Sequence, residues 1–162
     1  MQPATDKDLP KIVEIYNSTV PTRLATADIE PVSVESKRAW FNNHIPGKRP
    51  IMVERIEGEV AAWVSFESFY GRPAYDRTAE ISIYIAPEYR RQGLGKRLLK
   101  EALDMTPELG IRSVVAYIFS HNEGSIRLFR SFGFETWGDL PGIAEMDGKR
   151  YGLSILGKHV NP

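Results

Sequence analysis

Hydrophobic and polar positions alternate with two different periods along the chain, and the switches between them predict a mixed α/β protein. From Leu9 to Tyr16 apolar residues recur at helical spacing, and Asp6 or Asp8 is a candidate N-cap. The same spacing predicts four helices in all, at about 6–16, 33–43, 94–106 and 125–132. Runs rich in β-branched and aromatic residues predict strands at 51–56, 60–69, 78–86, 111–119, 134–137 and 151–156.

The passage from the strand at 78–86 into the next helix is the most informative segment. The strand stops at Ala86-Pro87, two arginines follow, and Gly93-x-Gly95 opens the helix. The first N–H groups of a helix have no partner within it, and the helix dipole adds positive potential there. Glycine at these two positions would let a phosphate approach the backbone where a Cβ would block it. The segment therefore predicts a site for a phosphate-bearing cofactor.

Two common phosphate-binding motifs do not fit this segment. A P-loop requires Ser or Thr after its Gly-Lys pair, and here Gly95-Lys96 is followed by Arg97. A Rossmann fingerprint requires a third glycine where this chain has Leu98. A plain helix cap flanked by solvated arginines is an alternative explanation of the same residues.

Composition narrows the classes of function. Lys plus Arg and Asp plus Glu number 21 each, so the formal net charge is zero, which argues against nonspecific nucleic-acid binding. The absence of cysteine excludes disulfides, thiolate metal sites and a cysteine nucleophile, and the three histidines lack metal-ligand spacing. With 162 residues, no apolar run of membrane-span length and no secretory h-region, we expect one domain over 1–162, no membrane partner and a cytoplasmic location.

Five short motifs are spread along nearly the whole chain. They are Ile15-Tyr16-Asn17, Ala39-Trp40-Phe41, the strand from Arg77 to Ile85, Ser120-His121-Asn122-x-x-Ser125 and Gly133-Phe134. Together with Arg90-x-x-Gly93-x-Gly95 as an acyl-CoA loop, they resemble the GNAT superfamily of N-acetyltransferases, and more narrowly the phosphinothricin acetyltransferase family.

The resemblance implies both a fold and a chemistry. The fold would be a GNAT fold of the α/β (α+β) type, with a central, mixed, mostly antiparallel twisted sheet of about seven strands flanked by about four helices. The co-substrate would be acetyl-CoA, with no metal, and the second substrate a small-molecule amine. Because the family often forms dimers, a homodimer is also expected.

The residues expected to bind the cofactor follow from the resemblance. The strand backbone at Ile83, Tyr84 and Ile85 would pair with the pantetheine arm as a neighbouring strand would. Asn122 would hydrogen-bond the pantetheine with Ser125 nearby, although an ordinary helix cap explains Asn122 equally well. The loop residues expected to wrap the pyrophosphate are Arg91, Gln92, Gly93, Leu94, Gly95 and Lys96.

Glu80 is the candidate catalytic residue. If no bulge intervenes, strand alternation places Glu80, Ser82 and Tyr84 on one face and the three intervening and following isoleucines on the other. An amine is mostly protonated near neutral pH, so acetyl transfer benefits from a base. The family equates this position with a base or water-positioning carboxylate. The alternative is a structural ion pair of Glu80 with Arg77 or Arg72 at the sheet surface.

Acceptor contacts are expected in the aromatic-rich loop before this strand, where the family places them. Arg72 would suit a carboxylate or phosphinate through bidentate hydrogen bonds. The alternative is that the aromatic side chains belong to the sheet core and the arginine is solvated. The residues expected to contact the acceptor are Arg72, Pro73, Ala74, Tyr75, Glu80, Ile81 and Ser82.

Two positions depart from the family pattern. Phe129 stands where many GNAT enzymes carry a tyrosine that protonates the leaving thiolate, so a tyrosine acid is excluded there. Tyr151 and Gly152 replace the aromatic residue and the acid of a C-terminal Gly-x-Trp-x-Asp motif, which leaves the identity of the acceptor open.

The resulting prediction is direct acetyl transfer, in a ternary complex, to a small amino-acid-like amine of the phosphinothricin or methionine sulfoximine/sulfone type. Three alternatives remain open: a protein or peptide N-acetyltransferase of the same superfamily, a non-catalytic acyl-CoA sensor, and a nucleotide-binding module.

Overall fold

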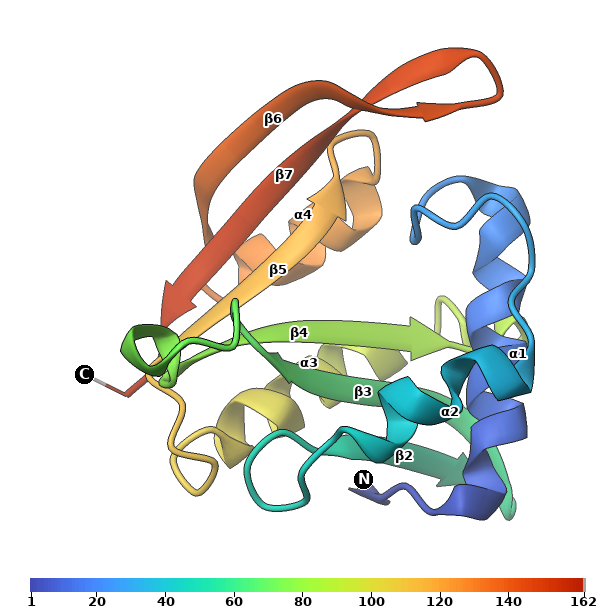
Figure 1. The fold of residues 1–162 in the computed structure, drawn as a ribbon, viewed down its shortest axis with the longest axis vertical. Coiled ribbons are helices and arrows are strands. Elements are labelled where there is room, and N and C mark those ends of the chain that lie inside the picture. Colours follow the sequence, from blue (N-terminus) through green and yellow to red (C-terminus); the bar gives the residue numbers. More distant parts are fainter. Residues whose placement is uncertain (162) are drawn as a thin grey trace.

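Seven strands form one sheet in residues 1–161, the part of the chain that the computed structural model describes (Figure 1). The strand order is β1-β2-β3-β4-β5-β7-β6, and every neighbouring pair is antiparallel except β4 and β5. The expectation of a mixed, mostly antiparallel sheet of about seven strands is confirmed. The strands are β1 (Gln2–Pro3), β2 (Ile51–Ile56), β3 (Glu59–Ser68), β4 (Thr78–Ile85), β5 (Ser113–Phe119), β6 (Glu135–Met146) and β7 (Lys149–His159).

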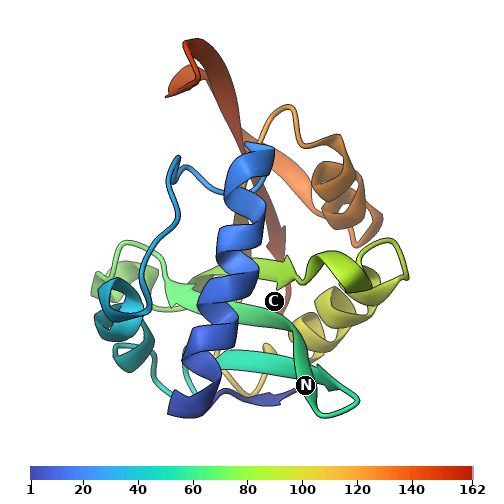
Figure 2. The ribbon, with the colours of Figure 1, turned by 90° about the vertical axis from the view of Figure 1, so that its right-hand side faces the viewer.

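Helices cover both faces of the sheet. Helices α1 and α2 pack on the face that carries Trp63, and α3 and α4 on the face that carries Val64 and Phe66. Figure 2 shows α1 lying across its side of the sheet. No helix in residues 1–161 is long and apolar enough to span a membrane. The helices are α1 (Leu9–Thr19), α2 (Val34–Asn42), α3 (Leu94–Met105) and α4 (Glu123–Ser131), with 3₁₀ turns at Asp6–Asp8, Val20–Thr22, Pro73–Tyr75 and Pro87–Tyr89.

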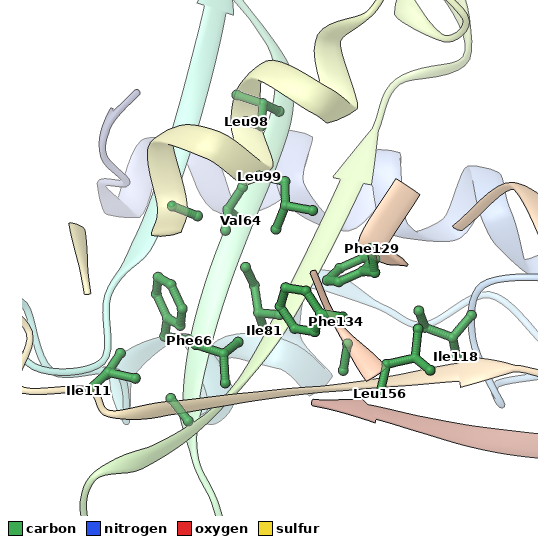
Figure 3. Close-up of a cluster of buried hydrophobic side chains, with 14 of the residues drawn as sticks. Val64, Phe66, Ile81, Leu98, Leu99, Ile111, Ile118, Phe129, Phe134 and Leu156 are labelled. Carbon is green, nitrogen blue, oxygen red and sulfur yellow. The ribbon is translucent and has the colours of Figure 1, made fainter. Parts of the chain in front are cut away.

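The larger core lies between the sheet and the pair α3 and α4. Leu98 and Leu99 from α3 and Phe129 from α4 are buried in one cluster with Phe66 and Ile81 of the sheet (Figure 3). Helices α1 and α3 bury one side each, which produces the helical period seen in the sequence, whereas β3 is covered by helices on both faces and is buried along most of its length. Apart from the last two strands, the predicted elements therefore begin and end within about three residues of the observed ones.

The last two strands extend well beyond the predicted ranges of 134–137 and 151–156. Strand β6 is mostly exposed, and its register with β7 shifts twice, after Thr136 and again after Leu140. Register shifts break the two-residue alternation, and exposure removes the hydrophobic signal. Both predicted ranges were therefore too short, and the two-residue β1 was missed because it is too short to show a period.

Strands β4 and β5 separate after a short stretch of pairing. Their register covers only Thr78 to Glu80 of β4, opposite Ser113 to Val115 of β5. Beyond that point the two strands diverge, while β4 stays paired with β3 up to Ile85 (Figure 1). One edge of β4 thus has no strand partner over its last residues, and a ligand there can supply the missing hydrogen bonds.

Candidate active site

The gap between the diverging strands holds a cavity of about 70 Å³. The predicted cofactor residues Ile83 and Tyr84 line it, and Ile85 follows on the same unpartnered edge of β4. This geometry agrees with contacts made through strand backbone, although their role in cofactor binding stays a prediction. The cavity is lined by Leu24, Ala25, Ile81, Ser82, Ile83, Tyr84, Ala116, Tyr117, Ile118, Phe119, Asn122, Ser125 and Phe129.

The N-terminus of α3 follows the end of β4 and presents free backbone N–H groups. Gly93 is the N-cap, with a φ of +79°, a left-handed conformation that glycine adopts without strain. The first N–H that bonds back into this turn is that of Arg97, which donates to the Gly93 carbonyl at 3.2 Å. Because the Gly93 position offers no side-chain cap, the N–H groups at 94–96 are available to an anion.

The basic side chains around this turn differ in their contacts. Arg91 and Lys96 are exposed, and neither forms an ion pair within residues 1–161. Arg90 instead points back into the protein, where Nε donates to the Ile85 carbonyl at 3.0 Å and Nη2 donates to Ser18 Oγ at 3.2 Å. Arg90 therefore holds the loop against β4 and α1, so it is not a solvated arginine.

Gly95 lies where α3 packs against β4 and α4. A Cβ on Gly95 would lie 3.4 Å from both Ile85 Cδ1 and Leu128 Cδ2, which is an ordinary contact distance, so packing alone does not require a glycine here. At Gly93, by contrast, a Cβ would meet no atom within 4 Å. Gln92 closes the same loop, since its Nε2 donates to the backbone carbonyl at position 88 at 3.0 Å.

Asn122 is the N-cap of α4. Its Oδ1 accepts a hydrogen bond from the Ser125 N–H at 3.2 Å, and its Nδ2 donates to the Leu24 carbonyl at 3.2 Å. The helix-cap explanation is therefore confirmed. Asn122 and Ser125 also line the β4–β5 gap, and a role for either in cofactor binding stays a prediction.

Glu80 lies in a larger hollow of about 470 Å³ next to the gap. The β3–β4 register runs without interruption along β4, so Glu80, Ser82 and Tyr84 share one face as predicted. Ser82 and Tyr84 line both the gap and the hollow, which makes the two spaces contiguous. The hollow is lined by Ala25, Thr26, Ala27, Glu80, Ser82, Tyr84, Tyr117, Phe119, Ile143, Ala144, Glu145, Met146 and Leu153.

The surroundings of Glu80 favour its protonated form. Burial, and then the negative charge of Glu67, raise the pKa of Glu80 to about 7. Glu67 lies directly opposite on β3, in register with Glu80. Within residues 1–161 no ion pair joins Glu80 to Arg77 or Arg72, so the structural ion-pair explanation is not supported. A carboxyl group that titrates near neutral pH is suited to accept a proton from an amine.

The loop at 23–28, after α1, closes one side of the hollow and was not expected from the sequence. Tyr84 Oη donates to the Ala25 carbonyl at 3.2 Å, and the Tyr16 hydroxyl forms a hydrogen bond with Thr26. The loop residues at this point are small and show no hydrophobic period, so no sequence signal marks them as part of a site.

The loop predicted to contact the acceptor does not line the Glu80 hollow. Arg72, Pro73 and Tyr75 line a separate hollow of about 310 Å³, and Glu80 does not line it. Ile81 points to the opposite face of β4 from Glu80 and is buried in the core. Of the predicted acceptor residues, the structure brings together only Glu80 and Ser82, and contacts by the 72–75 loop stay a prediction.

Phe129, which stands at the position of the missing tyrosine, is buried in the wall of the β4–β5 gap. Among residues 1–161, no three His, Asp or Glu side chains come together as a metal site would require.

Comparison with known proteins gives consistent matches. The model of the Acetyltransferase (GNAT) family matches residues 10–134. The "Putative phosphinothricin acetyltransferase YwnH" of Bacillus subtilis (strain 168) is 53% identical over 158 residues, covering 98% of this chain and 97% of that protein. An L-methionine sulfoximine/L-methionine sulfone acetyltransferase of Pseudomonas aeruginosa is 31% identical, covering 96% of this chain and 91% of that protein.

A solved structure of similar shape contains the expected co-substrate. It is a GNAT superfamily phosphinothricin acetyltransferase from Sinorhizobium meliloti in complex with acetyl-CoA. The TM-score is 0.92 at 30% sequence identity, and the match covers 99% of this chain and 87% of that chain.

Proposed function

Since the chain belongs to the acetyltransferase (GNAT) family and is an acetyl-CoA-dependent N-acetyltransferase, we propose that its acceptor is a small amino-acid-like amine. The relatives named for phosphinothricin and for methionine sulfoximine or sulfone support this class of acceptor. We assign Glu80 as the base or water-positioning carboxylate, and the transfer as a direct one within a ternary complex.

The contact between the Glu80 hollow and the β4–β5 gap is the observation that carries this proposal. Ser82, Tyr84, Tyr117 and Phe119 line both spaces, so groups bound in each can meet beside Glu80. The gap offers a free strand edge, and the N-terminus of α3 offers an anion site suited to a pyrophosphate. The hollow offers a carboxyl group poised near neutral pH.

The reaction needs one proton acceptor and one point of charge stabilisation. Glu80 takes a proton from the ammonium group of the acceptor, directly or through one water. The neutral amine then forms a C–N bond with the acetyl carbonyl carbon as the C–S bond breaks, and coenzyme A leaves as a thiolate. Backbone N–H groups around Ile83 or Tyr84 stabilise the charge that develops on the carbonyl oxygen. The attacking nitrogen loses its second proton as the amide forms, and because Phe129 has no hydroxyl, this proton passes to the thiolate directly or through water. Glu80 releases the first proton to water once the products have left.

The residues assigned to acetyl-CoA are those expected from the sequence. The backbone of Ile83–Ile85 contacts the pantetheine together with Asn122 and Ser125, and the turn at 91–96 holds the pyrophosphate. The uncapped N–H groups of α3, and the two exposed basic side chains beside them, support this assignment. A single domain over 1–162, a cytoplasmic location and a homodimer remain predictions, the last testable by light scattering.

Release of free thiol from acetyl-CoA in the presence of single amines tests the proposal. We expect turnover with L-methionine sulfoximine, L-methionine sulfone or phosphinothricin. In Glu80→Gln, kcat falls about 10²-fold or more, because the proton acceptor is lost. Glu80→Asp is the matched control, since it keeps a carboxylate and should keep a pH dependence.

Two results would contradict the proposal. Turnover with peptides but with none of the small amines would favour a protein acceptor, and acetyl-CoA binding without any turnover would favour a sensor. Full activity of Glu80→Gln at every pH would remove Glu80 from the mechanism.

A further inference from the structure

Glu67 is the nearest acidic neighbour of Glu80 on the adjoining strand. The two residues are directly opposed in the β3–β4 register, and in antiparallel strands such side chains lie close together on one face. Glu67 does not line the hollow that holds Glu80; it lines a separate cavity of about 170 Å³ beneath α1 and α2. Within the hollow, Glu80 is therefore the member of this pair that can meet a substrate.

Two side chains from α2 and its C-terminal end hold the carboxylate of Glu67. Trp40 Nε1 donates a hydrogen bond to Glu67 Oε1, and His44 Nε2 lies 3.8 Å from the same oxygen. The rings of Trp40 and His44 pack edge to face, with centroids 4.9 Å apart. Both side chains thus converge on one carboxylate oxygen, and each keeps the other in place.

His44 has a fixed ring orientation and one nitrogen without a partner. Nδ1 lies 2.8 Å from the Trp40 carbonyl, and since a carbonyl oxygen only accepts, Nδ1 carries a hydrogen. Nε2 is buried and forms no hydrogen bond with any residue of 1–161. In a neutral ring Nε2 would turn a lone pair towards the Glu67 carboxylate, which is unfavourable. A proton on Nε2 removes this conflict and makes His44 the cation of an ion pair with Glu67.

The other titratable groups around the two glutamates act less directly on Glu80. Burial raises the pKa of Tyr16, Tyr84 and Tyr117, so these side chains stay neutral near neutral pH. Besides burial, the charge of Glu67 is the influence that raises the pKa of Glu80. The remaining charged groups nearby are Asp28 in the loop after α1, Lys37 in α2 and Glu145 in β6.

We propose that His44 and Glu67 are positioning residues that form a charge pair beside Glu80 and set its strength as a base. The inference rests on the role proposed for Glu80 and adds the groups that regulate it. The negative charge of Glu67 opposes ionisation of Glu80, and the positive charge of His44 offsets part of that effect. Neither residue takes the proton of the acceptor; both act through Glu80.

Substitution of the two members of the charge pair should have opposite effects. Glu67→Gln removes the negative charge but keeps an oxygen for Trp40 Nε1, so Glu80 ionises at a lower pH. His44→Gln removes the positive charge and leaves Glu67 uncompensated, so Glu80 ionises at a higher pH. Residues that only supported the fold would not displace the ionisation of Glu80 in opposite directions.

The pH dependence of kcat/KM for L-methionine sulfone tests the inference in the full-length enzyme. Its acid limb reports the ionisation of Glu80 in the free enzyme, and the ionisation of the amine is common to all variants. The limb is expected to move by about half a pH unit or more, downwards in Glu67→Gln and upwards in His44→Gln. Above the limb, kcat/KM of Glu67→Gln should stay within about tenfold of the wild type, because Glu80 itself remains.

Two matched variants serve as controls. Glu67→Asp keeps the charge, so its acid limb should lie near that of the wild type. His159→Gln removes a histidine whose ring contacts Ser113 and neither carboxylate, so its limb should not move. If His44→Gln does not fold, His44→Asn takes its place, since it removes the same charge.

A titration without substrate separates this inference from the proposed function. In protein labelled with ¹³C at glutamate Cδ, NMR follows Glu80 directly, because its resonance is the one absent from Glu80→Gln. The same opposite displacements are expected there. If the wild type turned over no amine while the resonance moved as expected, the proposed function would fail and the charge pair would be retained.

Three results would overturn the inference. They are displacements in the same direction in Glu67→Gln and His44→Gln, no displacement in either one of them, and a raised KM for the amine in Glu67→Gln with an unmoved acid limb. The last result would make Glu67 a residue that binds the acceptor rather than one that acts through Glu80.

Discussion

Glu80 is the carboxyl group that the proposed reaction uses as a base, and it lies where its ionised form is disfavoured. A carboxyl group placed on a half-buried face, opposite Glu67, is a stronger base than an ordinary glutamate because its ionised form is destabilised. The same destabilisation acts on the folded state as a whole. Residues that serve catalysis often lower the stability of the fold in this way.

The pH dependence of stability should therefore reveal Glu80. Its folded pKa of about 7 lies above the ordinary 4.5, so its contribution to stability is fully present below pH 4.5 and is lost as pH rises through 7. Wild type should lose on the order of 1–2 kcal/mol over this range that Glu80→Gln does not lose, after allowance for partial exposure. Thermal unfolding should show Glu80→Gln gaining on the wild type between pH 5 and pH 8. An equal difference at both pH values would contradict the assignment.

Asn122 has two roles that a single pair of variants can separate. Asn122→Ala removes the Oδ1 that caps α4, which should cost about 1 kcal/mol of unfolding free energy. Asn122→Asp keeps a capping oxygen and loses the Nδ2 donor, so its stability should stay near that of the wild type. If Asn122 also binds the pantetheine, KM for acetyl-CoA rises in both variants. If KM for acetyl-CoA in Asn122→Asp equals that of the wild type, capping of α4 is the role left to Asn122.

Residue roles were predictable where the backbone alone sets them. The face shared by Glu80, Ser82 and Tyr84 follows from strand alternation, and the structure confirms it. The opposition of Glu67 to Glu80 depends on the β3–β4 register, which a sequence pattern does not reveal. The same is true of the division into two hollows, one lined by Glu80 and the other by Arg72, Pro73 and Tyr75.

At the scale of elements, the boundaries of the buried helices and strands were predicted more closely than those of the exposed ones. Helix α3 and strand β4 bury one side each, and their periods located them closely. Strand β6 is mostly exposed, and its register with β7 shifts twice, so it carries no comparable period. Its length matters because residues 143–146 of β6 form one wall of the Glu80 hollow.

The two glycines at the start of α3 should respond differently to substitution. Gly93 has a φ of +79°, where alanine is strained, so Gly93→Ala should lower the free energy of unfolding by about 1 kcal/mol. Gly95→Ala places a Cβ at ordinary contact distance, 3.4 Å from two side chains, and gains helix propensity. Its stability should equal or exceed that of the wild type in denaturant unfolding. Equal destabilisation by both substitutions would contradict this distinction.

At the scale of the whole molecule, the sheet consists of two parts joined by a short parallel seam. Strands β1 to β4 form one part and β5 to β7 the other, and the ladder between β4 and β5 covers three residue pairs. The resemblance to the GNAT superfamily implied the type of sheet. Hydrophobic periods alone could not locate the separation, because apolar residues continue along both strands past it.

If acetyl-CoA lies in the β4–β5 gap as proposed, the folding stability of this protein depends on its own co-substrate. A ligand that lies between β4 and β5 completes hydrogen bonds to the free edge of β4 and connects the two parts of the sheet. Acetyl-CoA at 100 times its Kd should raise the free energy of unfolding by about 2.7 kcal/mol, the amount that mass action requires. Amide hydrogen exchange should slow on both sides of the seam at once, in 81–85 and in 116–119, while exchange in the distant β6–β7 turn stays unchanged. In a cell, the fraction of unfolded enzyme would then follow the acetyl-CoA supply, so metabolic state would set the lifetime of the protein as well as its rate of turnover.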